Sequence, residues 1–274
     1  MTELNVAMVS MGDGRTIPQL GFGTYLTPPD EAERAVNQAL SVGYRHIDTA
    51  TLYGNESGVG AAIAASGIPR DQLFITTKLW RDSHKPELAR VAINASLEKL
   101  GLDHVDMYMI HWPAVVHFGD LYISAWDALQ EFKREGLATS IGVCNFNADN
   151  LDHLRGESPA LNQVELHPTF AQVPLREEMA RRGIPVESWS PLGRGADISH
   201  PTILRVASEV GRTPAQVIIR WHIQSGLVVI PKSVTPSRIA ENAQVFDFEL
   251  TPDQMAEIDS MDTSHRVGTD PATV

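Results

Sequence analysis

Short apolar runs alternate with segments of helical periodicity along almost the whole chain, and this alternation constrains the fold more than any other feature. Most of the apolar runs lack the polar–apolar alternation of a strand with one wet face, so they predict strands covered on both faces. The expected strands are residues 20–21, 45–47, 73–77, 105–110, 140–143, 161–164, 185–188 and 227–229. Strands that alternate with helices in this way are typical of a parallel α/β fold.

The intervening helices begin and end on recognisable residues. The segment 86–100 starts with Pro86, which the first helical turn tolerates, and it stops before Gly101. Further helices are expected at residues 30–41, 121–132, 147–154, 174–182, 214–224 and 236–243. The strand count and the length of 274 residues favour a closed (β/α)8 TIM barrel over an open sheet, as a single domain spanning residues 1–274.

Two terminal segments fall outside the repeating units. Residues 6–9 and 16–17 flank a Gly12-Asp13-Gly14 turn, which predicts a β-hairpin that would close the bottom of the barrel. The tail at residues 264–274 is polar and is expected to be irregular.

Composition excludes several classes of protein. Lys plus Arg number 22 and Asp plus Glu number 34, a net charge of −12 that argues against a duplex nucleic-acid partner. The only cysteine is Cys144, so no intrachain disulfide can form, which fits a reducing compartment. The sequence indicates no secretory signal and no membrane span, which favours a soluble, cytoplasmic protein. Without a long apolar seam, a monomer is expected.

Reactive side chains follow successive strands, where the active sites of such barrels lie. Asp48, Lys78 and His111 each stand at the end of an expected strand, and Tyr53 lies five residues beyond Asp48. Alone, such an Asp is usually a turn residue, such a Lys a solvated side chain and such a His part of a wall. Together they indicate one shared pocket, to which Asn145, Gln163 and Trp189 also belong.

These side chains suit the protonation of an oxygen atom. An aspartate would keep Lys78 charged, and that charge would lower the pKa of Tyr53, so that the phenol donates a proton nearer neutral pH. His111 would hydrogen-bond a substrate carbonyl and orient it. Since the set contains no electron source, a cofactor must supply the other half of the reaction.

Other site classes fit the residues less well. A Rossmann dehydrogenase needs Gly-x-Gly-x-x-Gly, whereas the Gly21-Phe-Gly23 and Gly58-Val-Gly60 segments lack the third glycine and the latter lies in an expected helix. A barrel glycosidase could pair Asp48 with Glu56 or Glu165. Nothing in that reading explains Lys78. No metal-ligand spacing is present, so no metal is expected.

Eight ordered motifs carry a resemblance to a known family. The sequence resembles the aldo-keto reductases over nearly its whole length, most closely the bacterial branch that includes 2,5-diketo-D-gluconate reductases. The motifs are GYRHIDTA (43–50), YGNE (53–56), TKLW (77–80), HWP (111–113), IGVCNF (141–146), NQVELHP (162–168), WSPLG (189–193) and IPKS (230–233). Residues 58–65 and Trp189 favour that branch.

The resemblance implies reduction of an aldehyde or ketone by hydride from NADPH, with Asp48, Tyr53, Lys78 and His111 as the catalytic tetrad. Asn145 and Gln163 would hold the nicotinamide carboxamide and Trp189 would stack on the ring. The other implied cofactor contacts are Gly23, Thr24, Cys144, Ser190, Leu192, Gly193, Ile230, Lys232, Ser233, Val234, Arg238, Glu241 and Asn242. Tyr25, Trp80, His111 and Trp112 would line a pocket for small dicarbonyls such as methylglyoxal or for diketo sugars.

Cofactor choice has its own support in the residues. Lys232, Ser233 and Arg238 surround the start of the helix at residue 236, and two cations, a hydroxyl and a helix N-terminus suit a phosphate. In the family these positions hold the 2′-phosphate, so NADP(H) is expected over NAD(H).

Two questions stay open at the level of the sequence. Cys144 stands where many relatives carry serine, and it is either a small buried apolar residue or an oxidation-sensitive thiol. The chain could also be an NADPH-binding redox sensor or adaptor with little turnover, as some barrels of this family are. The full tetrad favours turnover.

Overall fold

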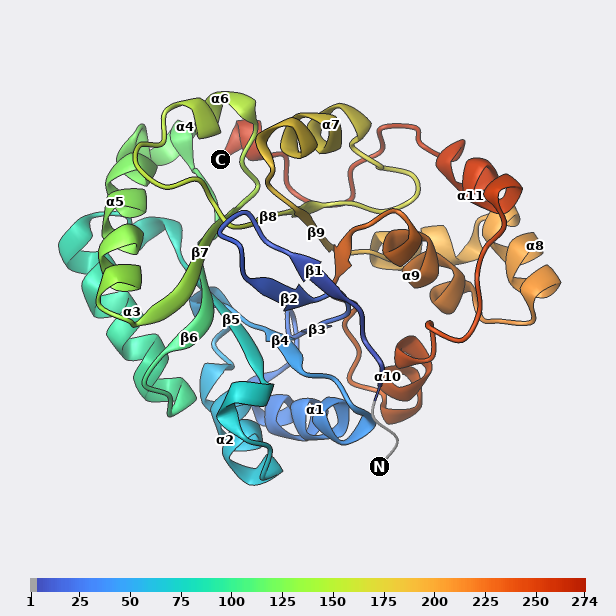
Figure 1. Cartoon of the computed structure of the whole chain (residues 1–274), viewed down its shortest axis with the longest axis horizontal. Coiled ribbons are helices and arrows are strands. Elements are labelled where there is room, and N and C mark those ends of the chain that lie inside the picture. The colour runs from blue at the N-terminus through green and yellow to red at the C-terminus, as the bar shows by residue number, and fades with distance from the viewer. Residues whose placement is uncertain (1–3) are drawn as a thin grey trace.

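The computed structural model describes residues 4–274 and contains a ring of eight parallel strands surrounded by helices (Figure 1). Neighbouring strands in the ladder follow the order of the chain, and a parallel bridge between Leu20 and Val229 joins its two ends. The strands are β3 (Phe22–Gly23), β4 (His46–Asp48), β5 (Phe74–Leu79), β6 (Val105–Ile110), β7 (Ala138–Cys144), β8 (Asn162–Glu165), β9 (Val186–Trp189) and β10 (Val228–Val229). The expected (β/α)8 fold is confirmed.

The helices form the outer layer of the barrel (Figure 1). They are α1 (Pro29–Val42), α2 (Glu56–Ser66), α3 (Pro86–Leu100), α4 (Val115–Phe118), α5 (Leu121–Arg134), α6 (Ala148–Asp152), α7 (Val173–Arg182), α8 (Pro201–Val210), α9 (Pro214–Gln224), α10 (Pro236–Ala243) and α11 (Pro252–Asp259). Helices α4, α8 and α11 were not predicted, and only residues 58–60 of α2 were expected to be helical. The short α4 carries no start signal, but α8 and α11 do. Both begin with the proline start signal recognised elsewhere in the sequence, and Thr251 even forms a capping box before α11.

Helix α1 illustrates how sequence spacing produces the outer layer. Ala32, Ala35 and Val36 recur at helical spacing and are buried against the barrel. Gly43 ends the helix with a φ of 119°, and its N–H donates to carbonyls of the last turn. Glycine adopts this backbone conformation without the steric cost of a side chain.

The N-terminal hairpin is present as expected, although its strands are shifted by one or two residues. Strands β1 (Met8–Ser10) and β2 (Thr16–Pro18) pair antiparallel. Ile17 is fully buried and packs in one apolar cluster with Met107 and Leu161 of the barrel. The hairpin therefore covers the end of the barrel at which the strands begin (Figure 1).

Several strands extend farther toward their carboxyl ends than predicted, because polar side chains lie inside them. Asp48 is the last residue of β4, and Lys78 lies within β5 rather than beyond it. The barrel interior also holds His46, Gln163 and Glu187, all buried. Within residues 4–274, no helix combines the length and apolarity that crossing a bilayer requires.

Candidate active site

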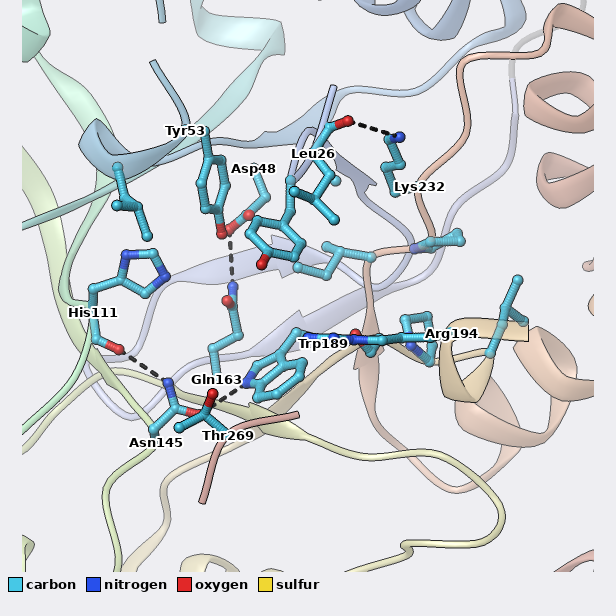
Figure 2. Close-up of a pocket in the computed structure, with 18 of the residues that line it drawn as sticks. Leu26, Asp48, Tyr53, His111, Asn145, Gln163, Trp189, Arg194, Lys232 and Thr269 are labelled. Carbon is cyan, nitrogen blue, oxygen red and sulfur yellow. Dashed lines mark hydrogen bonds between the residues drawn. The ribbon is translucent and has the colours of Figure 1, made fainter. Parts of the chain in front are cut away.

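A cavity of about 730 Å³ opens at the carboxyl ends of the strands (Figure 2). Strand ends and the loops after them supply its walls, as expected for a barrel of parallel strands. The predicted site residues that line it are Gly23, Tyr25, Asp48, Tyr53, Trp80, His111, Trp112, Asn145, Gln163, Trp189, Ser190, Leu192, Ile230, Lys232 and Arg238. The structure therefore brings most of the predicted residues together.

Lys78 lies behind the cavity wall and joins two of the lining residues. It is fully buried, and its Nζ donates to Asp48 Oδ1 at 2.5 Å and to the Thr49 carbonyl at 2.9 Å. The same Nζ lies 3.5 Å from Tyr53 Oη, and Tyr53 belongs to a 3-10 turn, η1 (Thr51–Tyr53). A buried ammonium is thus paired with one carboxylate and directed at one phenol.

The expected lowering of the pKa of Tyr53 is wrong for this structure. Burial raises the pKa of Tyr53 above its ordinary value, and the opposing effect of Lys78 is smaller than that of burial. Burial also acts against the charge on Lys78, but Asp48 outweighs it and the pKa of Lys78 is raised. At neutral pH the pair is therefore an ammonium beside a protonated phenol.

His111 is neutral at the same wall. Burial lowers its pKa well below the ordinary value, and the charge on Lys78 lowers it further. The imidazole packs edge-on against Tyr53, with ring centroids 5.6 Å apart, and against Trp80 at 5.2 Å. Its buried Nδ1 has no hydrogen-bond partner. The two aromatic contacts fix the ring close to the Tyr53 hydroxyl.

Three further side chains form a hydrogen-bonded wall beside the tetrad residues (Figure 2). Asn145 Nδ2 donates to the His111 carbonyl at 3.0 Å, and its Oδ1 accepts from Trp189 Nε1 at 2.9 Å. Gln163 Nε2 donates both to Asp48 Oδ2 at 2.9 Å and to Glu187 Oε2 at 2.8 Å. The Gln163 oxygen is therefore left as the acceptor of that amide.

Glu187 was not singled out from the sequence, although it lies beneath the site. Burial raises its pKa to about 8, and the nearby charge of Asp48 adds to the shift. Its Oε1 lies 3.6 Å from His46 Nε2, whose pKa burial lowers to about 3. Because Glu187 and His46 are both uncharged, Asp48 and Lys78 are the charged pair in this layer of the barrel.

The opposite end of the cavity is cationic. Lys232, Arg238 and Arg194 all line it, and Lys232 Nζ donates to the Leu26 carbonyl at 3.3 Å. Arg194 was not predicted. It lies in η4 (Gly193–Gly195) with a φ of 52°, a left-handed conformation that is uncommon for a side-chain-bearing residue.

Some predicted contacts do not line the cavity. Glu241 accepts a hydrogen bond from the Thr213 hydroxyl at 2.7 Å, which ties it to the start of α9. Ser233 accepts from the N–H of Thr235 at 3.1 Å. Thr24, Cys144, Gly193, Val234 and Asn242 are likewise absent from the lining. Sequence patterns do not distinguish the loop residues that face a cavity from the loop residues that face away from it.

Cys144 is a buried thiol. Its Sγ lies 3.8 Å from Met109 Sδ and 3.9 Å from Gln163 Oε1, and burial raises its pKa well above the ordinary value. Because oxidation needs an accessible thiolate, the surroundings favour the interpretation of Cys144 as a small buried apolar residue.

The remaining lining residues were not predicted as contacts, mainly because they come from loops and the tail. They are Leu26, Leu52, Arg81, Pro191, Arg194, Gly195, Ile198, Pro231, Thr269 and Val274. Thr269 and Val274 belong to the tail at residues 264–274, which was expected to be irregular. Their positions depend on how the irregular tail folds back, which periodicity does not encode.

The glycosidase reading is not supported. Glu56 accepts from the Thr77 hydroxyl at 2.7 Å, and Glu165 is bonded to backbone N–H groups of the tail. Neither lines the cavity that Asp48 faces. Within residues 4–274 the structure shows no cluster of three or more His, Cys, Asp or Glu side chains suited to a metal ion.

The fold is an eight-stranded parallel barrel with a cavity at the carboxyl ends of its strands, where the active sites of barrel enzymes lie. A buried lysine–aspartate pair lies beneath this cavity, next to a tyrosine. These features are typical of a barrel enzyme. A model of the aldo/keto reductase family matches residues 19–197 and 199–263. This chain belongs to the aldo/keto reductase family and is an oxidoreductase.

Individual relatives match over nearly the whole chain. Methylglyoxal reductase DkgA of Escherichia coli strain K12 is 48% identical over 272 residues, covering 97% of this chain and 98% of that protein. An aldo-keto reductase of Mycobacterium sp. strain KMS is 46% identical over 273 residues, covering 98% of each. Among solved structures, a variant of Gox0644 in complex with NADPH has a TM-score of 0.93 at 44% identity, covering 98% of both chains. Bombyx mori aldo-keto reductase in complex with NADP has a TM-score of 0.90 at 38% identity, covering 96% and 95%.

Proposed function

We propose that this protein reduces aldehydes and ketones to alcohols with NADPH, and that Tyr53 donates the proton. The observation that carries the proposal is that one cavity extends from Tyr53, which Lys78 contacts, to the cationic end at Lys232 and Arg238. When bound, NADPH supplies a hydride to the carbonyl carbon. The relatives solved with NADPH and NADP support this choice of cofactor.

The residues present fit a dinucleotide with an additional phosphate. Trp189 offers a flat ring beside the tetrad, and its indole N–H is held by Asn145 at 2.9 Å. The acceptor oxygen of Gln163 suits the N–H₂ of a carboxamide, because the Gln163 amide nitrogen already donates to Asp48 and to Glu187. Lys232, Arg238 and Arg194 supply cations for the phosphates at the far end.

Tyr53 is in the correct state to act as an acid. Its raised pKa keeps the phenol protonated at neutral pH, so a proton is available when negative charge develops on the carbonyl oxygen. As that oxygen takes the proton from Oη, Lys78 at 3.5 Å stabilises the tyrosinate left behind. Asp48 holds the Lys78 ammonium at 2.5 Å and so keeps this stabilising charge in position.

His111 is proposed to orient the carbonyl rather than to protonate it. Its lowered pKa makes the ring neutral, so it offers one N–H donor but no positive charge. Packing against Tyr53 and Trp80 fixes the plane of the ring. A carbonyl oxygen that accepts from His111 would therefore lie near Tyr53 Oη as well.

The aromatic walls favour small carbonyl substrates, and the named activity of the Escherichia coli relative supports methylglyoxal as a first candidate. We expect the loss of NADPH absorbance with a panel of aldehydes, ketones, methylglyoxal and diketo sugars to show turnover of several small dicarbonyls. Tight NADPH binding without turnover of any panel member would instead support a redox sensor. Action on one carbonyl alone would contradict the breadth proposed here.

Arg238→Ala is expected to raise KM for NADPH by about 10–100-fold, the worth of a hydrogen bond to a charged group. KM for NADH should change by less than about threefold, since NADH lacks the 2′-phosphate that Arg238 is proposed to contact. Steady-state kinetics with each cofactor measure both values. Arg205→Ala, which removes an exposed arginine of α8 paired with Glu209, is the matched control. Equal effects on the two cofactors would contradict the assignment.

A further inference from the structure

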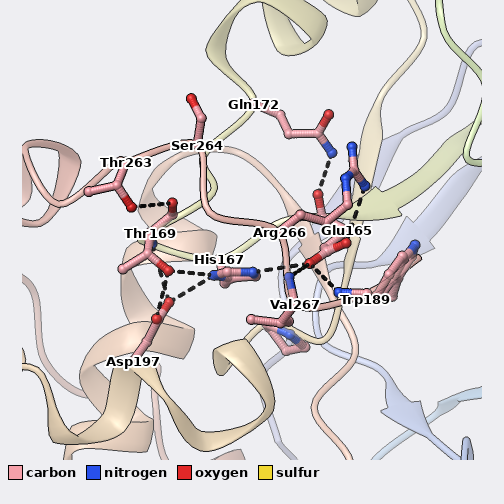
Figure 3. Close-up of polar contacts among 12 residues, drawn as sticks. Glu165, His167, Thr169, Gln172, Trp189, Asp197, Thr263, Ser264, Arg266 and Val267 are labelled. Carbon is pink, nitrogen blue, oxygen red and sulfur yellow. Dashed lines mark hydrogen bonds and ion pairs between the residues drawn. The ribbon is translucent and has the colours of Figure 1, made fainter. Parts of the chain in front are cut away.

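A second cluster of charged side chains lies next to the proposed active site, and the proposed chemistry does not use it (Figure 3). Glu165, His167 and Asp197 are each at most 1% exposed. His167 lies between the two carboxylates, with Nδ1 3.0 Å from Asp197 Oδ2 and Nε2 3.4 Å from Glu165 Oε1. Thr169 completes the cluster by donating its hydroxyl to Asp197 Oδ1 at 2.8 Å.

The cluster holds the segment of the tail at residues 263–269, here called the strap. Glu165 Oε1 accepts from the backbone N–H groups of Val267 at 2.5 Å and of Gly268 at 2.9 Å. Glu165 Oε2 accepts from Arg266 Nη1 at 3.2 Å. The strap contains no helix or strand, so these bonds to one buried carboxylate take the place of regular secondary structure.

A backbone carbonyl forms a second anchor, which holds the start of the strap. The Thr169 carbonyl accepts from the N–H groups of Thr263 at 3.2 Å and of His265 at 3.1 Å. The guanidinium of Arg266 also lies 4.4 Å from the centre of the Phe170 ring. The first anchor, Glu165, is the last residue of β8, and Thr169 and Phe170 follow it in the chain.

The anchored strap contacts the proposed cofactor and substrate walls. A Cβ added to Gly268 would lie 2.3 Å from Trp189 Cη2, so the Gly268 backbone packs directly on the indole. The next residue, Thr269, lines the cavity. Asp197 lies in η5 (Asp197–Ser199), which follows Arg194 and Gly195 in the chain. Arg194 and Gly195 line another wall of the same cavity. One charged cluster thus joins two walls of the pocket.

We propose that Glu165 is a positioning residue that fixes the strap. Through the strap it fixes the outer face of Trp189 and the cavity wall at Thr269, and this wall sets the fit of the carbonyl substrate. His167 and Asp197 hold the Glu165 carboxylate in place. The effect on substrate fit rests on the proposed function, whereas the anchoring of the strap does not.

The pKa shifts within the cluster reflect the mutual attraction of its groups. Burial acts against a charged His167, but hydrogen bonds and charge from Asp197 and Glu165 outweigh it and raise the pKa of His167. Burial likewise opposes the charge on Glu165, but bonds from His167, Val267 and Gly268 and the charge of Arg266 lower its pKa. Glu165 therefore faces the Arg266 guanidinium and an imidazole whose protonated form the two carboxylates favour, so a neutral side chain at residue 165 would leave Arg266 without its buried carboxylate.

Glu165→Gln and Gly268→Ala test the anchoring without NADPH or substrate. Glu165→Gln removes the charge, and Gly268→Ala forces the strap away from Trp189 at a residue whose φ suits alanine. In timed trypsin digestion of the full-length protein, read by mass spectrometry, both variants should be cut after Arg266 at least about tenfold faster than wild type. Glu157→Gln, which loses a surface ion pair with Lys133, should be cut there at the wild-type rate.

The same variants then test the effect on substrate. With methylglyoxal as the probe, Glu165→Gln and Gly268→Ala should raise KM by about tenfold and change kcat by less than about threefold, because the strap shapes the wall and not the proton donor. Glu157→Gln should match wild type in both constants.

The digestion tests the anchoring of the strap, and the kinetics test its effect on substrate fit. Wild-type cleavage rates in Glu165→Gln and Gly268→Ala would overturn the anchoring, and faster cleavage with unchanged KM would overturn the role in substrate fit. If Glu165→Gln does not fold, Gly268→Ala decides alone. If the wild type turns over no carbonyl, the proposed function fails while the digestion still decides the anchoring.

Discussion

Tyr53→Phe is expected to reduce kcat for carbonyl reduction by about 10²–10⁴-fold, the range that general acid catalysis contributes. The substitution removes only the Oη atom that lies 3.5 Å from Lys78 Nζ and leaves the half-buried ring in place. The ring contact with His111 at 5.6 Å is kept, so the cavity should keep its shape. Steady-state kinetics give kcat, and quenching of tryptophan fluorescence gives the Kd for NADPH, which we expect to change by less than about threefold.

Tyr25→Phe is the matched comparison for Tyr53→Phe. Tyr25 lines the same cavity with its ring 5.2 Å from that of Tyr53, but it has no hydrogen bond to Lys78. Removing its hydroxyl should lower kcat by less than about tenfold. If the two variants lost activity equally, the assignment of Tyr53 as the proton donor would be wrong.

Lys78→Met is expected to lower both activity and stability. The rate should fall by about 10²–10³-fold, because the charge that stabilises the tyrosinate is lost. The free energy of unfolding should fall by about 3–5 kcal/mol, because Asp48 is left as a buried carboxylate without its cation. Activity assays and urea unfolding, compared with wild type, measure the two losses separately.

The double variant Asp48→Asn with Lys78→Met separates these two losses. It removes both buried charges, so much of the stability lost in Lys78→Met should return. Activity should stay low, because neither side chain can then stabilise the tyrosinate. Return of activity together with stability would show that Lys78 serves the fold and not the reaction.

The fold was predictable because each strand and helix carries its own local signal. Seven of the eight apolar runs overlap a strand of the barrel, whereas the run at residues 20–21 ends just before β3 (Phe22–Gly23). Helices α3, α9 and α10 have the predicted bounds. The strand ends were less predictable, since β5 continues through Lys78, a residue type that is rarely buried. A lysine inside a barrel strand is intelligible only once Asp48 of the neighbouring strand is known to face it.

The residues of the candidate site were predictable from the sequence, but the direction of the pKa shift of Tyr53 was not. The sequence analysis named Asp48, Tyr53, Lys78 and His111, and the structure brings all four together. It expected Lys78 to lower the pKa of Tyr53, whereas burial has the larger effect and raises it. Burial is a property of the packed molecule, and a residue list cannot weigh it against a neighbouring charge.

The anchoring of the strap could not be derived from residue patterns. The motif at residues 162–168 contains both Glu165 and His167, yet Glu165 was considered only as a glycosidase carboxylate. Its partners Val267 and Gly268 bind through backbone N–H groups, which carry no signal in the sequence. Such contacts emerge only from the three-dimensional course of an irregular segment.

A single-turnover stopped-flow experiment tests the central claim most directly. NADPH that carries deuterium at its transferable position would be mixed with methylglyoxal and either wild type or Tyr53→Phe, and the product would be examined by mass spectrometry. Wild type is expected to form an alcohol with one deuterium on the former carbonyl carbon, at least about 10²-fold faster than Tyr53→Phe. Equal rates for the two proteins, or a product without deuterium, would contradict the central claim.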